Sequence, residues 1–218
     1  MKTLANDIKY RSYIKGKRVI LVGPSPNIIG SSQGEFIDSH DIVIRTNGAF
    51  PVKSEYQKDY GKRCDSLYVN SLFARETNLP IKEYSELGMS FLNMKQDSKN
   101  IAIRNKNSKL SFRVFTKSYQ ESRHVISRNP LMGNYIIYEI LACNPSSLHV
   151  TGMSLYSESN ISSHYIDDYL PMVCNPLKLD ETRKKSHDQV NQNNQIKALI
   201  LSNKITADET ILKILSIL

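Results

Sequence analysis

The clearest hydrophobic pattern in the chain is a short apolar run, Val19–Val22, which ends in the turn-forming sequence Gly-Pro-Ser-Pro at residues 23–26. Its length and its β-branched residues indicate a strand that is buried on both faces. A second turn follows at residues 30–32, and a second strand is predicted at residues 41–46. The carboxyl ends of parallel strands lie at one edge of a sheet, so the residues after both strands are expected to share one space.

Polar side chains suited to ligand binding follow these predicted strands. Ser25 and Asn27 come after the first strand, and Arg45 and Asn47 lie at the end of the second. Asn70 ends a third predicted strand, which begins at residue 66. Open α/β sheets bind nucleotides at this edge, which makes the side chains that follow the first two strands candidate ligand contacts.

The middle of the chain is less regular. The pattern predicts a helix within residues 71–86, a strand at residues 88–92, a polar and basic loop at residues 93–109, and a short strand at residues 112–115. The basic loop is open to two interpretations, a ligand-facing loop or ordinary solvated surface.

A further helix and strand are predicted after Gly133. Apolar residues at positions 136, 137, 140 and 141 have helical spacing, so the helix is expected to start just after this glycine. The free N–H groups at its start, near Gly133 and Asn134, suit a carboxylate or a phosphate. A buried strand is predicted at residues 148–151, ending at Gly152.

The elements together predict a single α/β domain over residues 1–218, with a mostly parallel, Rossmann-like sheet covered by helices on both faces. Residues 1–17 are interpreted as a polar lead-in with room for a short helix, and residues 211–218 as the end of a docked amphipathic helix. The length of 218 residues and the 40% hydrophobic content are sufficient for one core.

Charge adds information about binding partners. Lys and Arg number 29 against 21 Asp and Glu, which gives a formal net charge of +8. This excess favours anions such as a nucleotide, a phosphorylated or acidic acceptor, or a nucleic acid. The same excess also fits a surface that only promotes solubility, and composition does not decide between the two.

The sequence contains no apolar stretch of the roughly 20 residues that a membrane span needs, and its amino terminus lacks a signal-peptide pattern. The three cysteines, Cys64, Cys143 and Cys174, are odd in number and lack metal-binding spacing. A reducing cytoplasm is the simplest explanation for this cysteine usage. We therefore expect a soluble cytoplasmic protein without a membrane partner.

Residues 22–49 resemble the long donor-binding motif of the eukaryotic-type sialyltransferases, which runs V-G-N-S-G and then S-x-x-G-x-x-I-D-x-H-D-x-V-x-R-x-N-x-A. Pro24 replaces the usual Asn of the motif. The resemblance implies donor contacts at Gly23, Ser25, Asn27, Arg45, Asn47 and Asn70. The matching residues are Val22, Gly23, Ser25, Ser31 or Ser32, Gly34, Ile37, Asp38, His40, Asp41, Val43, Arg45, Asn47 and Ala49.

Residues 130–152 resemble the short motif of the same family. The matches are Pro130, Gly133, Cys143 and Gly152. Leu131 and Met132 replace the hydroxyl residues that meet the donor sugar and its carboxylate in the family. Apolar side chains cannot donate those hydrogen bonds, and a buried carboxylate short of partners costs about 1–3 kcal/mol, so a donor without sialic acid stays open.

The resemblance also bears on the disulfide of the family, which joins the two motifs. Val19 stands at the position of one of its cysteines, while Cys143 keeps the other. The bridge is therefore expected to be absent.

Two histidine segments resemble later motifs of the family. His164, Tyr165 and Asp167 resemble H-Y-x-E/D, and His187 resembles the histidine of H-x-x-x-x-E, whose glutamate is replaced by Gln192. A lone histidine is usually structural, but the order of the motifs favours catalysis here. The resemblance implies that His187 is the base that deprotonates the acceptor and that His164 and Tyr165 stabilise the departing phosphate.

The resemblance covers about residues 18–200 and implies a metal-independent, inverting glycosyltransferase that uses no cofactor. Its donor would be a CMP-sugar such as CMP-sialic acid, or another nucleotide sugar, and its acceptor a glycan hydroxyl. No D-x-D pair follows a strand, and neither a G-x-G-x-x-G nor a P-loop sequence occurs. Two alternatives stay open: a soluble enzyme that glycosylates a hydroxymethylated DNA base, and a non-catalytic nucleotide or nucleic-acid binder, which the loss of the glutamate supports.

Overall fold

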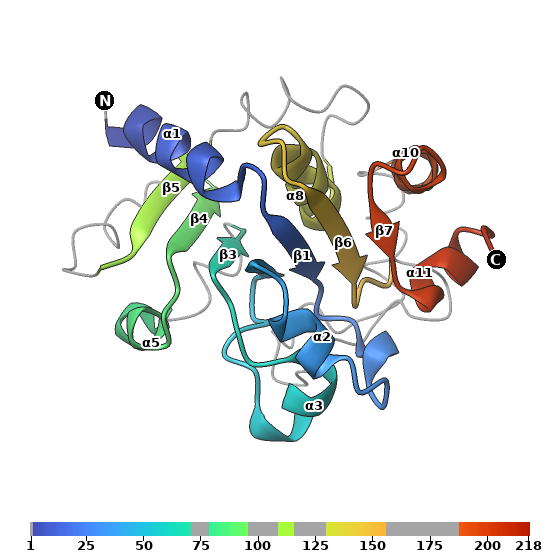
Figure 1. The fold of residues 1–218 in the computed structure, drawn as a ribbon, viewed down its shortest axis with the longest axis horizontal. Coiled ribbons are helices and arrows are strands. Elements are labelled where there is room, and N and C mark those ends of the chain that lie inside the picture. Colours follow the sequence, from blue (N-terminus) through green and yellow to red (C-terminus); the bar gives the residue numbers. More distant parts are fainter. Residues whose placement is uncertain (1, 71–78, 96–108, 116–129, 156–187) are drawn as a thin grey trace.

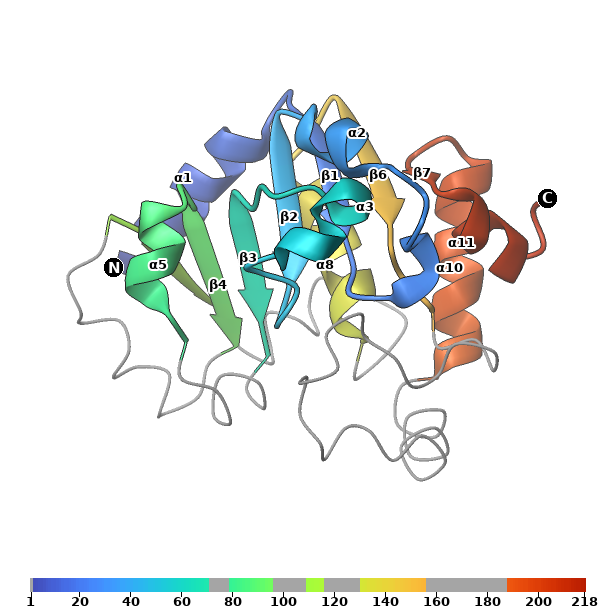
Figure 2. The same ribbon diagram turned by 90° about the horizontal axis from the view of Figure 1, so that it is seen from below.

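The structure is a computed structural model that describes residues 2–70, 79–95, 109–115, 130–155 and 188–218. Within these ranges seven strands form one sheet, in the order β5-β4-β3-β2-β1-β6-β7. The strands are β1 Arg18–Val22, β2 Ile42–Thr46, β3 Ser66–Val69, β4 Phe91–Lys95, β5 Ser111–Phe115, β6 Ser147–Thr151 and β7 Thr206–Ala207. Each adjacent pair is parallel, and the strand arrows point the same way (Figure 2).

Helices cover both faces of the sheet (Figure 1). The α-helices are α1 Lys2–Ile14, α2 Gly34–Asp38, α3 Gln57–Tyr60, α5 Ile81–Glu86, α8 Met132–Leu141, α10 Gln189–Leu201 and α11 Glu209–Ile214. Two short 3-10 helices are η1 Pro26–Ile28 and η2 Ser54–Tyr56. The predicted α/β class, with a parallel sheet between helical layers, is confirmed.

The central strand β1 is buried on both faces. Ile20 and Val22 pack with residues of α2, α3 and α5, whereas Val19 and Leu21 pack with residues of α1, α8, α10 and α11. All four side chains are 0% exposed. Because side chains alternate along a strand, one apolar run supplies both cores, as the sequence pattern predicts.

Several predicted elements differ from the structure in their bounds. Residues 1–17 are predicted to be a polar lead-in with room for a short helix; a helix is present, but α1 has 13 residues, and its Tyr10 and Ile14 are fully buried. The strand predicted at residues 88–92 is β4, which starts at Phe91 because Gly88 closes the turn after α5 with a φ of +86°. The predicted loop at residues 93–109 therefore begins too early. The helix expected after Gly133 starts one residue before it.

Asn93 belongs to a buried polar network on the α1 and α8 face of the sheet. Tyr68, Asn93 and Arg113 occupy one register row across β3, β4 and β5. The Arg113 guanidinium donates to Glu139 of α8 over 2.6 Å and to Asn93 over 2.8 Å. The Tyr68 hydroxyl donates to the other carboxylate oxygen of Glu139 over 2.7 Å. The network ties α8 to three strands.

Removal of Glu139 is expected to destabilise the protein strongly. Arg113 and Glu139 have side chains that are 3% and 1% exposed, so Glu139→Leu removes the buried carboxylate partner of the cation and leaves it the partly exposed Asp7. We expect a loss of about 3–5 kcal/mol in the free energy of unfolding, measured by chemical denaturation.

The exposed pair of α5 provides the matched control. Lys82 and Glu86 are 3.7 Å apart with side chains 91% and 65% exposed, so Glu86→Leu should change the same free energy by less than about 0.5 kcal/mol. Similar losses in the two variants would contradict the structural importance of the buried pair.

The stability of the fold is also expected to depend on His149 of β6. Its ring stacks on that of His40 at a centroid distance of 6.3 Å, and its Nδ1 lies 2.8 Å from the Thr206 hydroxyl. The pKa of His149 falls from 6.5 to about 4, mainly because the ring is buried; the charge of Asp208 opposes this shift, and nearby His40 adds to it. The unfolded chain therefore binds more protons between these two pH values.

Because the folded-state pKa is the lower one, the contribution of His149 is present above about pH 6.5 and is lost as the pH falls toward 4. We expect this loss to reach roughly 2–3 kcal/mol. Thermal melting of the wild type and of His149→Gln at pH 7 and pH 4.5 measures it. The wild type should lose more stability than the variant, and equal losses would show that His149 is not responsible.

Candidate active site

The strand order changes direction between β1 and β6, and this switch point marks the candidate site. From β1 the chain runs through β2 to β5 on one side and then returns to place β6 on the other side of β1. Beyond the carboxyl ends of β1 and β6, the N–H of Gly23 donates to Thr151 and that of Ser25 donates to Gly152, both over 2.9 Å. Open parallel sheets bind ligands in the crevice at such a point.

The turn after β1 presents a polar group. Ser25 is 3% exposed, and its hydroxyl oxygen accepts the N–H of Asn27 over 3.4 Å at the start of η1. The Tyr60 hydroxyl donates to the carbonyl of Ser25. The side-chain nitrogen of Asn27 is buried, and within the described part of the chain nothing accepts a hydrogen bond from it. Asn27 therefore carries a donor that suits an acceptor on a ligand.

Asn47 and Asn70 hold the next two strand ends together. Asn47 has a left-handed backbone with a φ of +49°, and its N–H donates to the carbonyl of Tyr68 over 2.7 Å. Its side-chain carbonyl accepts the N–H of Asn70 over 2.9 Å. The predicted neighbourhood of these asparagines is present, and the oxygen of Asn47 has a structural partner.

Arg45 is anchored by the backbone that follows α3. Its side chain is fully buried and donates to the carbonyls of Tyr60 and Arg63 over 2.6 and 2.7 Å. Arg45 packs on the face of β2 that meets α2 and α3, so it has a structural role, and its contact with a donor stays a prediction. It holds the segment that follows α3.

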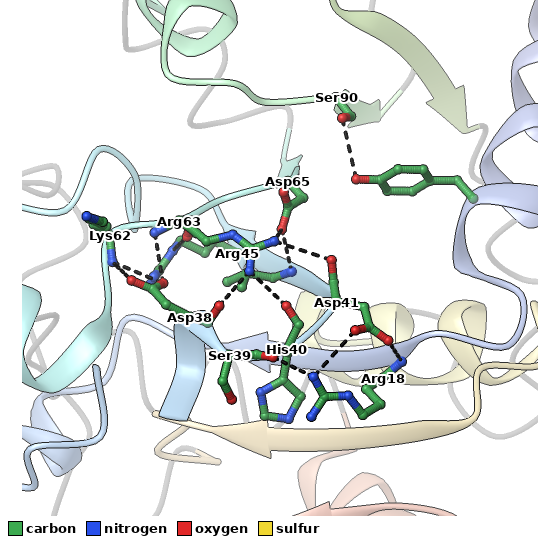
Figure 3. A network of polar contacts seen from close by, with 12 residues as sticks. Arg18, Asp38, Ser39, His40, Asp41, Arg45, Lys62, Arg63, Asp65 and Ser90 are labelled. Carbon is green, nitrogen blue, oxygen red and sulfur yellow. Dashed lines mark hydrogen bonds and ion pairs between the residues drawn. The ribbon is translucent and has the colours of Figure 1, made fainter. Parts of the chain in front are cut away.

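Other residues of the long motif support the same segment (Figure 3). The Asp38 carboxylate accepts the N–H groups of Lys62 and Arg63 over 2.9 and 3.0 Å, and the Arg63 guanidinium donates to the carbonyl of His40 over 2.8 Å. Asp59 accepts the N–H groups of Gly30 and Ser32, each over 2.8 Å. These acids are satisfied by backbone donors, so they shape the turns around the site.

The amino terminus of α8 is braced by α10. The side-chain oxygen of Gln192 accepts the N–H of Leu131 over 2.9 Å and the amide of Asn134 over 3.0 Å. A side chain at Gly133 would overlap the end of Met153, a flexible group. Gly133 and Asn134 thus lie in the first turn of α8, as the sequence predicted.

Helix α10 begins at Gln189, directly after Asp188. Asp188 has a left-handed backbone with a φ of +47°. Gln189 donates from its side chain to the carbonyl of Leu155, beyond β6, over 2.6 Å. The candidate catalytic residues His187, His164 and Tyr165 lie outside the described residues.

Asp208 connects β7 to the switch point. Its carboxylate accepts the Thr151 hydroxyl over 2.8 Å, the N–H of Gly152 over 2.9 Å and the N–H of Ile211 over 2.8 Å. Asp208 therefore caps α11 and at the same time fixes the end of β6. No sequence motif pointed to this residue, because an acid before a helix is common.

The two cysteines within the described residues are free and buried. Burial raises the pKa of Cys64 to about 12 and that of Cys143 to about 11, so both stay protonated thiols at neutral pH. Cys143 donates to the carbonyl of Glu139 over 3.2 Å. The expectation that Cys143 forms no bridge is met, and Cys174 lies outside the described residues.

A model of glycosyltransferase family 29, the sialyltransferases, matches residues 11–171, which is more than half of the chain. The chain belongs to this family. The suspected resemblance is thereby confirmed, and the protein is a glycosyltransferase of the nucleotide-sugar type. None of the curated proteins matches the chain.

Solved structures of a mammalian sialyltransferase share the fold. One, in complex with Gal-beta-1-3GalNAc-ortho-nitrophenol, has a TM-score of 0.63 and 18% identity, and the match covers 95% of this chain and 78% of that one. A second has a TM-score of 0.62 and 18% identity, with 94% and 79% covered. At this identity the likeness describes the fold.

Two surveys of the described residues concern metals and membranes. Nowhere in the ranges that the structure describes do three or more His, Cys, Asp or Glu side chains gather as a metal site would require. The expected metal independence stays a prediction. Among the same residues, no helix has both the length and the apolar character to cross a membrane.

Replacement of Asn47 is expected to separate backbone strain from hydrogen bonding. Asn47→Ala loses the acceptor for Asn70 and places a Cβ that lacks a compensating polar group in the left-handed region. We expect a loss of about 2–3 kcal/mol in the free energy of unfolding, measured by chemical denaturation.

Two matched variants separate the contribution of the left-handed backbone from that of the hydrogen bond to Asn70. Asn47→Gly keeps the left-handed backbone and should lose about 1 kcal/mol, while Asn47→Asp keeps the acceptor and should stay within about 0.5 kcal/mol of the wild type. Equal losses for the Ala and Asp variants would exclude the hydrogen bond to Asn70 as the cause.

Proposed function

We propose that this sialyltransferase family member transfers a sugar, in the first instance sialic acid, from its CMP-activated form to a hydroxyl group of a glycan without a metal ion. The observation that carries the proposal is the amide of Asn27 at the switch point, a buried donor that has no acceptor within the described residues. A buried N–H₂ group without a partner costs free energy, and the oxygens of a nucleotide are suitable acceptors.

The amino terminus of α8 supports an anionic donor. The N–H groups of Met132, Gly133 and Asn134 begin the helix, and the side chain of Leu131, which precedes them, makes no cap hydrogen bond. These N–H groups and the positive end of the helix dipole favour a phosphate or carboxylate. Leu131 and Met132 offer no hydroxyl groups there, so contacts to the sugar depend more on the backbone.

The proposed reaction is an inverting displacement. The acceptor hydroxyl oxygen forms a bond to the anomeric carbon and gives its proton to His187, while the bond from that carbon to the CMP phosphate oxygen breaks. The phosphate leaves with the electron pair. His164, Tyr165 and the α8 terminus are assigned to stabilising the charge that develops on it.

A glycan is the favoured acceptor. The mammalian sialyltransferase of similar fold binds a compound that contains Gal-beta-1-3GalNAc. The net charge of +8 fits an anionic donor as well as it fits DNA, so it gives the DNA-base alternative no advantage. The non-catalytic alternative rested on Gln192, whose side chain has hydrogen-bond partners at the start of α8.

Calorimetry in the presence of a metal chelator is expected to show that CMP binds more tightly than CDP, UDP or GDP. The Asn27→Ala variant should bind CMP about 5- to 30-fold more weakly, because it loses one buried hydrogen bond to the nucleotide. Asn194→Ala, which alters an exposed residue of α10, is the control and should bind CMP like the wild type.

Transfer from CMP-sialic acid to a galactose-terminated glycan then tests the enzyme itself. A wild-type chain that binds CMP but transfers no sugar would support the non-catalytic alternative. Preference for a nucleoside diphosphate would contradict the CMP donor, and transfer to hydroxymethylated DNA would contradict the glycan acceptor. Full activity of His187→Ala would remove His187 from the mechanism.

A further inference from the structure

Gln192 joins two elements that are distant in the sequence but meet beside the candidate site. It lies in the first half of α10 and is 1% exposed. Its Oε1 accepts two hydrogen bonds from the start of α8, one from the N–H of Leu131 and one from the Nδ2 of Asn134. Both donors are therefore held by one oxygen atom.

The hydrogen bonds determine the orientation of the side-chain amide groups of Gln192 and Asn134. The N–H of Leu131 is a backbone group and can only donate, so the atom of Gln192 that faces it must be Oε1. That oxygen can only accept, so Asn134 must turn its Nδ2 toward it. The Oδ1 of Asn134 consequently faces elsewhere, and among the described residues no group donates a hydrogen bond to it.

We propose that Gln192 is a positioning residue that fixes the first turn of α8 and orients Asn134, so that Asn134 Oδ1 accepts a hydrogen bond from a hydroxyl or amino group of the bound nucleotide sugar. The proposal rests on the proposed function, because it names a specificity contact of that same site. Asn134 is 2% exposed, which limits its freedom to turn by itself.

The start of α10 is held firmly enough for this role. Gln189 bonds the carbonyl of Leu155 over 2.6 Å, and the Asn191 side chain donates to the Asp188 carboxylate over 2.7 Å. Asp188 adopts a left-handed backbone directly after His187. Contacts to the end of β6 and to α8 thus fix the beginning of the helix that follows the proposed base.

An amide suits this position electrostatically. A carboxylate at residue 192 would also accept both hydrogen bonds, but it would place a negative charge beside the positive end of α8. The neutral oxygen of Gln192 holds the helix and leaves that end available to an anionic ligand. Gln192 therefore has a structural role at the start of α8.

The test combines hydrogen exchange of the Leu131 amide with calorimetric binding of CMP and CMP-sialic acid. Gln192→Met keeps the approximate length of the side chain but removes the acceptor. We expect exchange at Leu131 to accelerate about tenfold or more and CMP-sialic acid to bind about 5- to 30-fold more weakly. Melting temperatures confirm that each variant is folded during binding.

Three further variants separate the hydrogen bonds of Gln192 from the ligand contact of Asn134. Gln192→Glu keeps both hydrogen bonds, so Leu131 should stay protected and binding should change by no more than about fivefold. Asn134→Leu should weaken binding of CMP-sialic acid while Leu131 stays protected. Asn194→Met, at an exposed position of α10, should change neither measurement.

If the exchange rate of the Leu131 amide is unchanged in Gln192→Met, Gln192 does not hold the first turn of α8, and the proposal is overturned. Faster exchange with unchanged binding of CMP-sialic acid would overturn the positioning role while leaving the proposed function intact. If the wild type binds neither CMP nor CMP-sialic acid, the proposed function fails and the ligand contact of Asn134 fails with it. The exchange measurement then still decides whether Gln192 holds α8.

Discussion

The close approach of β1 and β6 is the constraint on which the rest of the structure depends. A side chain on Gly23 would overlap the carbonyl of Gly152, and Gly152 itself has a φ of +65°. Two glycines therefore allow the backbones beyond these strands to touch and to exchange hydrogen bonds. The turn that carries Ser25 and Asn27 leaves the sheet from this contact.

The long motif combines two kinds of residue that look alike in the sequence. Asp38 accepts backbone N–H groups of a neighbouring turn, and Arg45 donates to carbonyls inside the core. The side-chain nitrogen of Asn27, in contrast, is buried without an acceptor among the described residues. Backbone groups in buried turns need hydrogen-bond partners. Part of a motif of this length therefore serves the irregular turns at the sheet edge, and part serves the chemistry of the site.

The sequence predicted the parallel sheet, its central strand and the strand ends that form the site, because two-sided burial leaves a strong apolar signal. The sequence-based prediction failed where the buried residues are polar. Asn93 looked like the start of a loop but belongs to the network of Arg113 and Glu139. Gln192 looked like a lost glutamate, and its partners at residues 131 and 134 are visible only once α8 and α10 are packed. Long-range hydrogen bonds of this kind leave no local pattern.

The position of Asp208 in the chain has a consequence for how the molecule assembles. Strands β1 to β5 follow one another across the sheet, so they can pair in order as the chain is synthesised. The end of β6 is fixed by Asp208, which is far from β1 in the sequence. Contacts between distant segments form slowly because a long loop must close first. We therefore expect the crevice to be completed after the strands that follow one another in sequence have paired.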